Sequence, residues 1–282
     1  MSGSRPRVSG GCAKLAAMPG RYTHQRFCDL ASDEIARLAT AVDGADPATP
    51  VPTCGHWTMA DLVQHIGHIH RWAGAMVADL SPTRYSRKKA DLPLPADPAT
   101  WPAWLAEAQT TLIPALRAAD PDARMWAWGP DKHARFWSRR MVHETAVHRV
   151  DAELALAVEP EVDPAVATDG IGEFLENLPR SQALHGNGEQ LHLVASDHPG
   201  HWTIVRRPTT FTWIDNGAED QGGGPAAPSV TAHAPTAPSV TVRGPTADLY
   251  LFLWGRRRPT HPSLTVTGDA ALLTHWQRHA VI

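Results

Sequence analysis

Hydrophobic residues recur with the period of an α-helix in four segments of the first half of the chain. The segments cover residues 27–42, 58–80, 101–119 and 137–158. In the second segment Leu62, Val63, Ile66 and Ile69 share one face of a helix, while polar residues occupy the other. Pro-rich or Trp/Gly-rich stretches separate the segments. This pattern predicts an N-terminal four-helix bundle.

The pattern changes after Pro160. Strand-like runs follow at residues 191–196, 202–206, 210–214, 229–232 and 239–243, and helical runs at 164–178, 247–254 and 269–279. They predict a small α+β domain with a mostly antiparallel sheet. With the boundary at Pro160 and Pro164, the chain divides into a poorly ordered extension (1–22), the bundle (23–160) and the α+β domain (161–282).

The fourth helical segment carries two metal-ligand side chains where a packed helix should be apolar. Glu144 and His148 lie on the same stripe as Trp137, Met141 and Ala155, within about 40° of one line along the helix. A buried carboxylate is costly unless a charge neutralises it. The sequence leaves two explanations open. One is a metal ion, and the other is a buried pair of Glu144 with a histidine or with Arg140 or Arg149.

The second helical segment offers a third ligand. Thr58 and Asp61 form the capping pair that marks the start of this helix. His65 and His70 flank its apolar face on opposite edges, so either could join the site, and periodicity does not choose between them. His68 lies away from the apolar face, and we expect it to be solvated.

Composition favours a small-molecule partner. The 282 residues include 26 Lys and Arg against 29 Asp and Glu, a balance that gives no electrostatic reason to expect a nucleic acid. No run of 18 apolar residues predicts a membrane span, and no secretory signal is evident, so we expect a cytoplasmic protein. Nothing in the sequence indicates an oligomeric state. The three cysteines are expected to be reduced thiols, although Cys54 precedes the helix that carries His65.

Two helix motifs, WTMADLVQHIGHIHRWA from Trp57 and RRMVHETAVHRVDAELA from Arg139, resemble the mycothiol-dependent maleylpyruvate isomerase family. That family has a DinB-like four-helix bundle. In the second half LHLVASD, DLYLFLWGR and LTVTGDAALL are similar to the sterol-carrier-like α+β domain that follows the bundle. The resemblance covers about residues 25 to 282.

The resemblance implies that His65, Glu144 and His148 bind a divalent metal ion, which selects His65 over His70. Two histidines and one carboxylate form the ligand set of a catalytic zinc site, although Fe(II) can use the same set. The histidines of HETAVH are five residues apart, so the motif is not the HExxH of zinc proteases. In the family the metal activates the thiol of mycothiol, the cosubstrate, for addition to a small electrophile.

Further residues are expected around this site. Arg256, which matches the family's WGR motif, is the candidate catalytic cation for a substrate carboxylate or enolate. We expect Trp126, Trp128 and Arg257 to bind the thiol cofactor. Asp151 and Arg149 are expected to orient the metal ligands or to pack against them.

The favoured function is a metal- and mycothiol-dependent enzyme, either an isomerase of maleylpyruvate type or an S-transferase. One alternative is a metal-dependent hydrolase that activates water and needs no thiol. Another is a non-catalytic regulatory protein that binds a small ligand. Turnover that needs no thiol would indicate the hydrolase. The absence of any turnover would indicate the regulatory protein.

Overall fold

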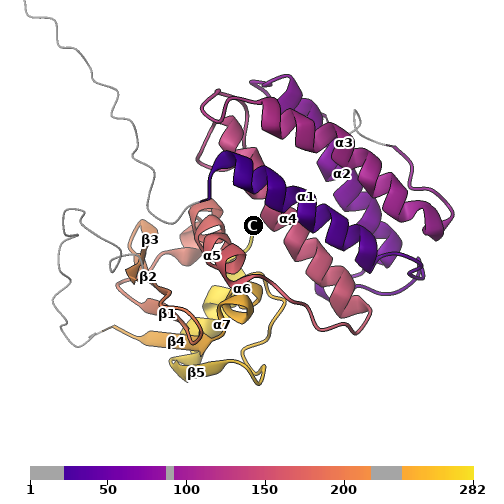
Figure 1. Cartoon of the computed structure of the whole chain (residues 1–282). Helices are drawn as coiled ribbons and strands as arrows, with labels where there is room; N and C mark the ends of the chain where they lie inside the picture. Colours follow the sequence, from indigo (N-terminus) through magenta and orange to yellow (C-terminus); the bar gives the residue numbers. More distant parts are fainter. Residues whose placement is uncertain (1–21, 87–91, 217–236) are drawn as a thin grey trace, which may run out of the picture.

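The computed structural model describes residues 22–86, 92–216 and 237–282 of the chain. The expected extension therefore lies almost wholly outside the described residues, as does the expected strand at 229–232. Four long helices form the bundle of Figure 1, and their bounds are α1 His24–Ala41, α2 Met59–Ala78, α3 Trp101–Ala118 and α4 Ala134–Ala155. These four helices confirm the bundle that the hydrophobic pattern predicts.

Local sequence explains where the helices begin. The Thr23 side chain accepts a hydrogen bond from the Arg26 amide at the start of α1. Thr58 and Asp61 form a full capping box at the start of α2, in which each side chain accepts from the other residue's amide. The N-cap of α4 is His133, with no side-chain cap. Helix α4 starts three residues before the predicted Trp137. The reason is that Ala134 and Phe136 already pack into the core.

The second half is an α+β unit with a five-stranded sheet. Its helices are α5 Pro164–Asn177, α6 Thr246–Leu253 and α7 Ala270–His279. The strands are β1 Gln190–Ala195, β2 His201–Arg207, β3 Thr210–Asp215, β4 Ser239–Gly244 and β5 Thr265–Gly268. Their order is β3-β2-β1-β4-β5, and only the β1–β4 pair is parallel, with Leu191 opposite Val240. The α plus α+β fold class is thus confirmed.

The two halves share one continuous apolar core. Figure 1 shows α5 and α6 between the sheet and the bundle. Buried side chains run without interruption from Ile69 and Val142 in the bundle through Ile171 and Tyr250 to Leu193 in the sheet. No helix in the described part of the chain is both long and apolar enough to cross a membrane. The bundle and the sheet therefore meet across a packed boundary.

Candidate metal centre

Side chains from α2 and α4 converge where these two helices face each other. His65 Nε2 lies 3.3 Å from Glu144 Oε1, and His148 Nε2 lies 3.6 Å from the same oxygen. One donor atom from each of the three residues lies within 4.8 Å of the other two. The three positions expected from the sequence thus come together in the fold.

His70, the other histidine of α2 that periodicity allowed, is elsewhere. Its side chain is fully buried in the bundle, with Nε2 2.9 Å from the Thr145 hydroxyl. Burial lowers the pKa of His70 to about 3, so this ring is neutral at any physiological pH. His70 does not line the cavity described below. It is therefore part of the bundle core.

Glu144 has a different partner for each oxygen. Oε1 faces the two histidines, and Oε2 accepts a hydrogen bond from Arg140 at 3.3 Å. Burial favours the neutral acid, but the hydrogen bonds of His148 and His65 and the charge of Arg140 outweigh it and lower the pKa of Glu144 well below its usual range. The carboxylate is therefore ionised. Arg140 is itself neutralised, because both oxygens of Glu173 accept from its Nη1 at 2.7 Å.

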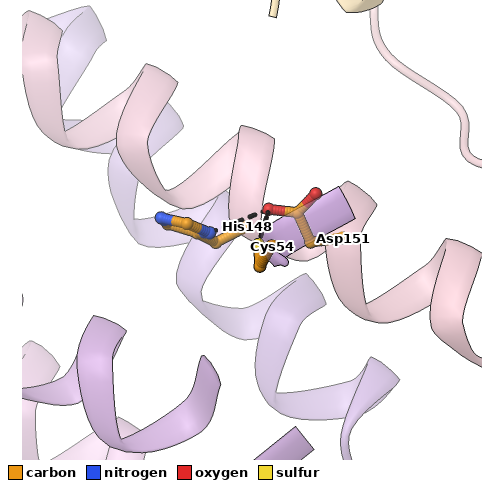
Figure 2. Close-up of side chains that lie close together, drawn as sticks. All are labelled: Cys54, His148 and Asp151. Carbon is orange, nitrogen blue, oxygen red and sulfur yellow. Dashed lines mark hydrogen bonds and ion pairs between the residues drawn. The ribbon is translucent and has the colours of Figure 1, made fainter. Parts of the chain in front are cut away.

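A second carboxylate orients His148. Asp151 lies one turn further along α4, and its Oδ2 is 2.9 Å from His148 Nδ1 (Figure 2). Burial opposes protonation of His148, but its hydrogen bonds with Asp151, Cys54 and Glu144 raise its pKa well above the usual range. Nδ1 is thus the donor to Asp151, and Nε2 is directed at Glu144 and His65. A carboxylate behind a histidine in this way is typical of metal sites.

Asp151 also joins three segments of the chain. Its side chain is fully buried, and it accepts hydrogen bonds from Thr53 at 2.5 Å and from the Cys54 thiol at 3.2 Å, both in the short 3-10 helix Pro52–Cys54. Arg256, just after α6, adds two more, from Nε at 2.8 Å and from Nη2 at 2.7 Å. Figure 2 shows the Cys54 thiol beside the His148 ring and the Asp151 carboxylate. The hydrogen bond between Cys54 and Asp151 was not predicted, because it joins two segments that are far apart in the sequence.

The donor set fits a divalent metal ion. Two imidazole nitrogens and one carboxylate oxygen approach a common point, and Asp151 already fixes the orientation of one imidazole. Trp57 packs against both rings, with centroids 4.8 Å from His65 and 6.0 Å from His148. Residues His65, Glu144 and His148 could therefore hold the ion. Cys54, His148 and Asp151 also lie close enough together to do so, but Asp151 is already paired with Arg256.

These three residues line one wall of a cavity of about 570 Å³. The same α4 stripe continues along the wall through Met141 to Trp137. Trp126 and Trp128, from the loop before α4, also line the cavity. Segments of the second half, including residues 252–256 and 276–277, complete it. The cavity thus lies between the two halves of the molecule.

The expected basic residues have different positions. Arg256 lines the cavity, with its guanidinium held by Asp151 and by the carbonyl of Trp254. Arg257 points elsewhere. It is buried and paired with Asp248 at 2.7 Å and with Glu159, and it does not line this cavity. The structure therefore brings Arg256 into the site and leaves Arg257 outside it, because successive residues after α6 face opposite sides.

Arg149 is also remote from the ligands. Its fully buried guanidinium bonds to Glu34 of α1 at 2.6 Å and to Glu153 at 2.5 Å. Arg149 connects α1 with α4. Within the described residues it forms no hydrogen bond or ion pair with Glu144. Of the two residues expected to support the ligands, Asp151 touches one and Arg149 packs behind the helix.

Comparison with known families agrees with the fold and the motifs. Residues 28–153 match the mycothiol maleylpyruvate isomerase N-terminal domain, and residues 165–275 match the C-terminal domain of the same family. The chain belongs to this family.

Solved structures show the same fold in other members. The crystal structure of the mycothiol-dependent maleylpyruvate isomerase superposes with a TM-score of 0.54 at 16% identity, covering 88% of this chain and 93% of that one. A histidine-to-alanine mutant of that enzyme gives a TM-score of 0.56 with the same identity and coverage. No curated protein matches the sequence of this chain. At 16% identity, this likeness shows that the present chain has the same fold, and no more than that.

Proposed function

We propose that this family member is a metal- and mycothiol-dependent enzyme that adds or transfers the thiol to a small electrophile. The reaction is either a cis–trans isomerisation of maleylpyruvate type or an S-transfer. The observation that carries the proposal is the convergence of His65, Glu144 and His148 on the wall of a cavity large enough for a small molecule.

The metal is proposed to be zinc, which these three residues would hold. A divalent ion there would supply Lewis-acid chemistry and would lower the pKa of a thiol from about 8.5. The Asp151 carboxylate keeps the proton of His148 on Nδ1 and leaves Nε2 as the ligand atom. Arg140 holds the second oxygen of Glu144 and so fixes the direction of the first.

Arg256 is proposed as the catalytic cation. It faces the cavity while Asp151 fixes its guanidinium, so its charge has a defined position beside the ligands. Negative charge that develops on a substrate carboxylate or enolate would be stabilised there. Trp126 and Trp128 are proposed to contact the thiol cosubstrate, because both line the cavity.

The test is metal content, thiol binding and turnover in matched variants. We expect near-stoichiometric zinc by elemental mass spectrometry in the wild type, and loss of most of it in His65→Ala, Glu144→Ala and His148→Ala. The control is His68→Ala, also on α2, whose Nε2 lies 2.7 Å from the Leu92 carbonyl and which lines no part of the cavity. It should keep its zinc.

Mycothiol binding, measured by calorimetry, should depend on the metal, and electrophile turnover should require the thiol. Metal with turnover that needs no thiol would replace the proposal with a hydrolase. Metal-free wild-type protein would mean that Glu144 and the two histidines are only a buried hydrogen-bonded cluster.

A further inference from the structure

The cavity extends well beyond the metal centre. Trp72 lies seven residues after His65 on α2, and Trp137 lies seven residues before Glu144 on α4. Seven residues make two helical turns, or about 10 Å of helix. The rings of Trp72 and Trp137 are in contact, with centroids 5.6 Å apart. The far end of the cavity is therefore about 10 Å from the ligand cluster.

Three indole rings form this far end. Trp126 closes the group, with its centroid 5.8 Å from Trp72 and 5.9 Å from Trp137. Its backbone carbonyl accepts the Trp137 indole N–H at 2.9 Å, which ties the Trp126 backbone to the Trp137 ring. The walls here are apolar. They would accept the hydrocarbon or aromatic body of a small molecule.

One cation lies beside these rings. The guanidinium carbon of Arg84 is 6.0 Å from the centroids of both Trp72 and Trp126, and Arg84 lines the same cavity. Among the cavity-lining arginines, Arg140 forms ion pairs with Glu173 and Glu144, and Arg256 forms one with Asp151. Within the described residues Arg84 forms no ion pair. Its charge is therefore available to a ligand.

The segment that carries Arg84 is anchored to the same tryptophans. Two residues after the end of α2, Leu80 has a left-handed backbone (φ 44°), so the chain changes direction there. The Trp126 amide then donates to the Ser81 carbonyl at 2.7 Å, and the Trp72 indole donates to the Tyr85 carbonyl at 2.9 Å. Arg84 lies between these two bonds. Its position at the cavity mouth is thus built into the fold.

We propose that Arg84 binds a carboxylate of the substrate, and that the electrophile has an apolar body with this carboxylate at the end remote from its reacting end. The inference rests on the proposed function, because the reacting end lies at the metal centre. The rings of Trp72 and Trp137 bind the body of the molecule. Arg84 binds the anion through charge-assisted hydrogen bonds. Arg84 then determines specificity at the far end, while Arg256 acts near the metal.

The test uses two inert probes of nearly the same size and shape, the anion 4-phenylbutanoate and the neutral amide 4-phenylbutanamide. Their dissociation constants are measured by ligand-observed NMR on the full chain as purified and after removal of zinc with a chelator. We expect the carboxylate to bind roughly tenfold more tightly than the amide, as a charge-assisted hydrogen bond implies. Arg84→Gln should reduce this preference to less than about twofold, and Arg84→Lys should keep most of it.

Arg258→Gln is the matched control, because Arg258 is exposed and lines no part of the cavity. This substitution changes the net charge by the same amount as Arg84→Gln. Its preference should equal that of the wild type. A preference that survives Arg84→Gln, or that disappears when zinc is removed, would place the carboxylate elsewhere and overturn the inference. Failure of the wild type to bind either probe would do the same. Neither probe reacts with a thiol, so these results are independent of the turnover tests.

Discussion

At the scale of single residues, the site is defined by which atom of each side chain is already occupied. Asp151 engages Nδ1 of His148, and Arg140 engages Oε2 of Glu144. The atoms that remain, Nε2 and Oε1, face each other and His65. The supporting residues therefore determine the geometry of the ligands as much as the helix does.

We accordingly expect Asp151→Asn to weaken zinc binding by about 10- to 100-fold, because an amide orients and polarises His148 less well than a carboxylate. Zinc affinity is measured by competition with a chromophoric chelator. The matched control is Asp169→Asn. Asp169 is a similarly buried carboxylate that bonds to His143 of α4 at 2.8 Å and to Arg139, away from the cavity. Equal zinc affinities of Asp151→Asn and the wild type would show that Asp151 has no role at the ligand.

Residue patterns predicted part of the site and missed part of it, for a physical reason. Glu144, His148 and His65 lie on regular helices, where spacing determines direction. Arg84 lies in a turn, and its place depends on bonds from Trp72 and Trp126, which are far apart in the sequence. Arg257 follows Arg256 directly, yet only one of the two faces the cavity. No local pattern distinguishes them.

At the scale of elements, helices were easier to predict than strands. A helix of 18 or more residues, such as α1 or α4, repeats its apolar stripe several times. Strand β5, Thr265–Gly268, has four residues that are mostly exposed, and it exists because β4 pairs with it. The sequence pattern does not predict strand β5. Pairing between distant segments carries no signal within either segment.

Helices α4 and α5 are joined by a buried ionic network whose pH dependence can be predicted. Burial disfavours ionised Asp169, but the hydrogen bond of His143 and the charge of Arg139 outweigh it and lower its pKa from 3.8 to about 2. A shift of this size corresponds to about 2 kcal/mol of folding free energy. Because the folded pKa is depressed, this stabilisation is present above pH 4 and is lost as the pH falls toward about 2.

We expect Asp169→Asn to lower the free energy of unfolding by about 2 kcal/mol at pH 7. The difference between wild type and variant should shrink as the pH falls from 4 to 3. Urea unfolding at a series of pH values measures it, and subtraction of the two curves removes the contribution of the other carboxylates. A difference that is constant with pH would show that Asp169 stabilises the helices through shape and not through charge.

At the scale of the whole molecule, the two halves are joined at the cavity and through the core. Arg256 follows α6 and reaches Asp151 of α4, which is bonded to His148. Gly170 of α5 lies so close to Tyr250 and His143 that an added Cβ would be 2.4 Å from the Tyr250 ring. Contacts of this kind bury polar and apolar groups together. Relative motion of the halves would break both the core and the site.

We therefore expect the bundle and the α+β unit to unfold as one cooperative unit, even though each matches its own domain family. Hydrogen exchange followed by mass spectrometry at increasing urea should give one midpoint for peptides from α2 and from β1. The proposed zinc site consists of bundle residues alone, yet added zinc should raise both midpoints equally, because a ligand of the native state stabilises everything that unfolds with its site. Two separate midpoints, or a shift confined to α2, would mean that the halves are independent and that the cavity between them opens without global unfolding.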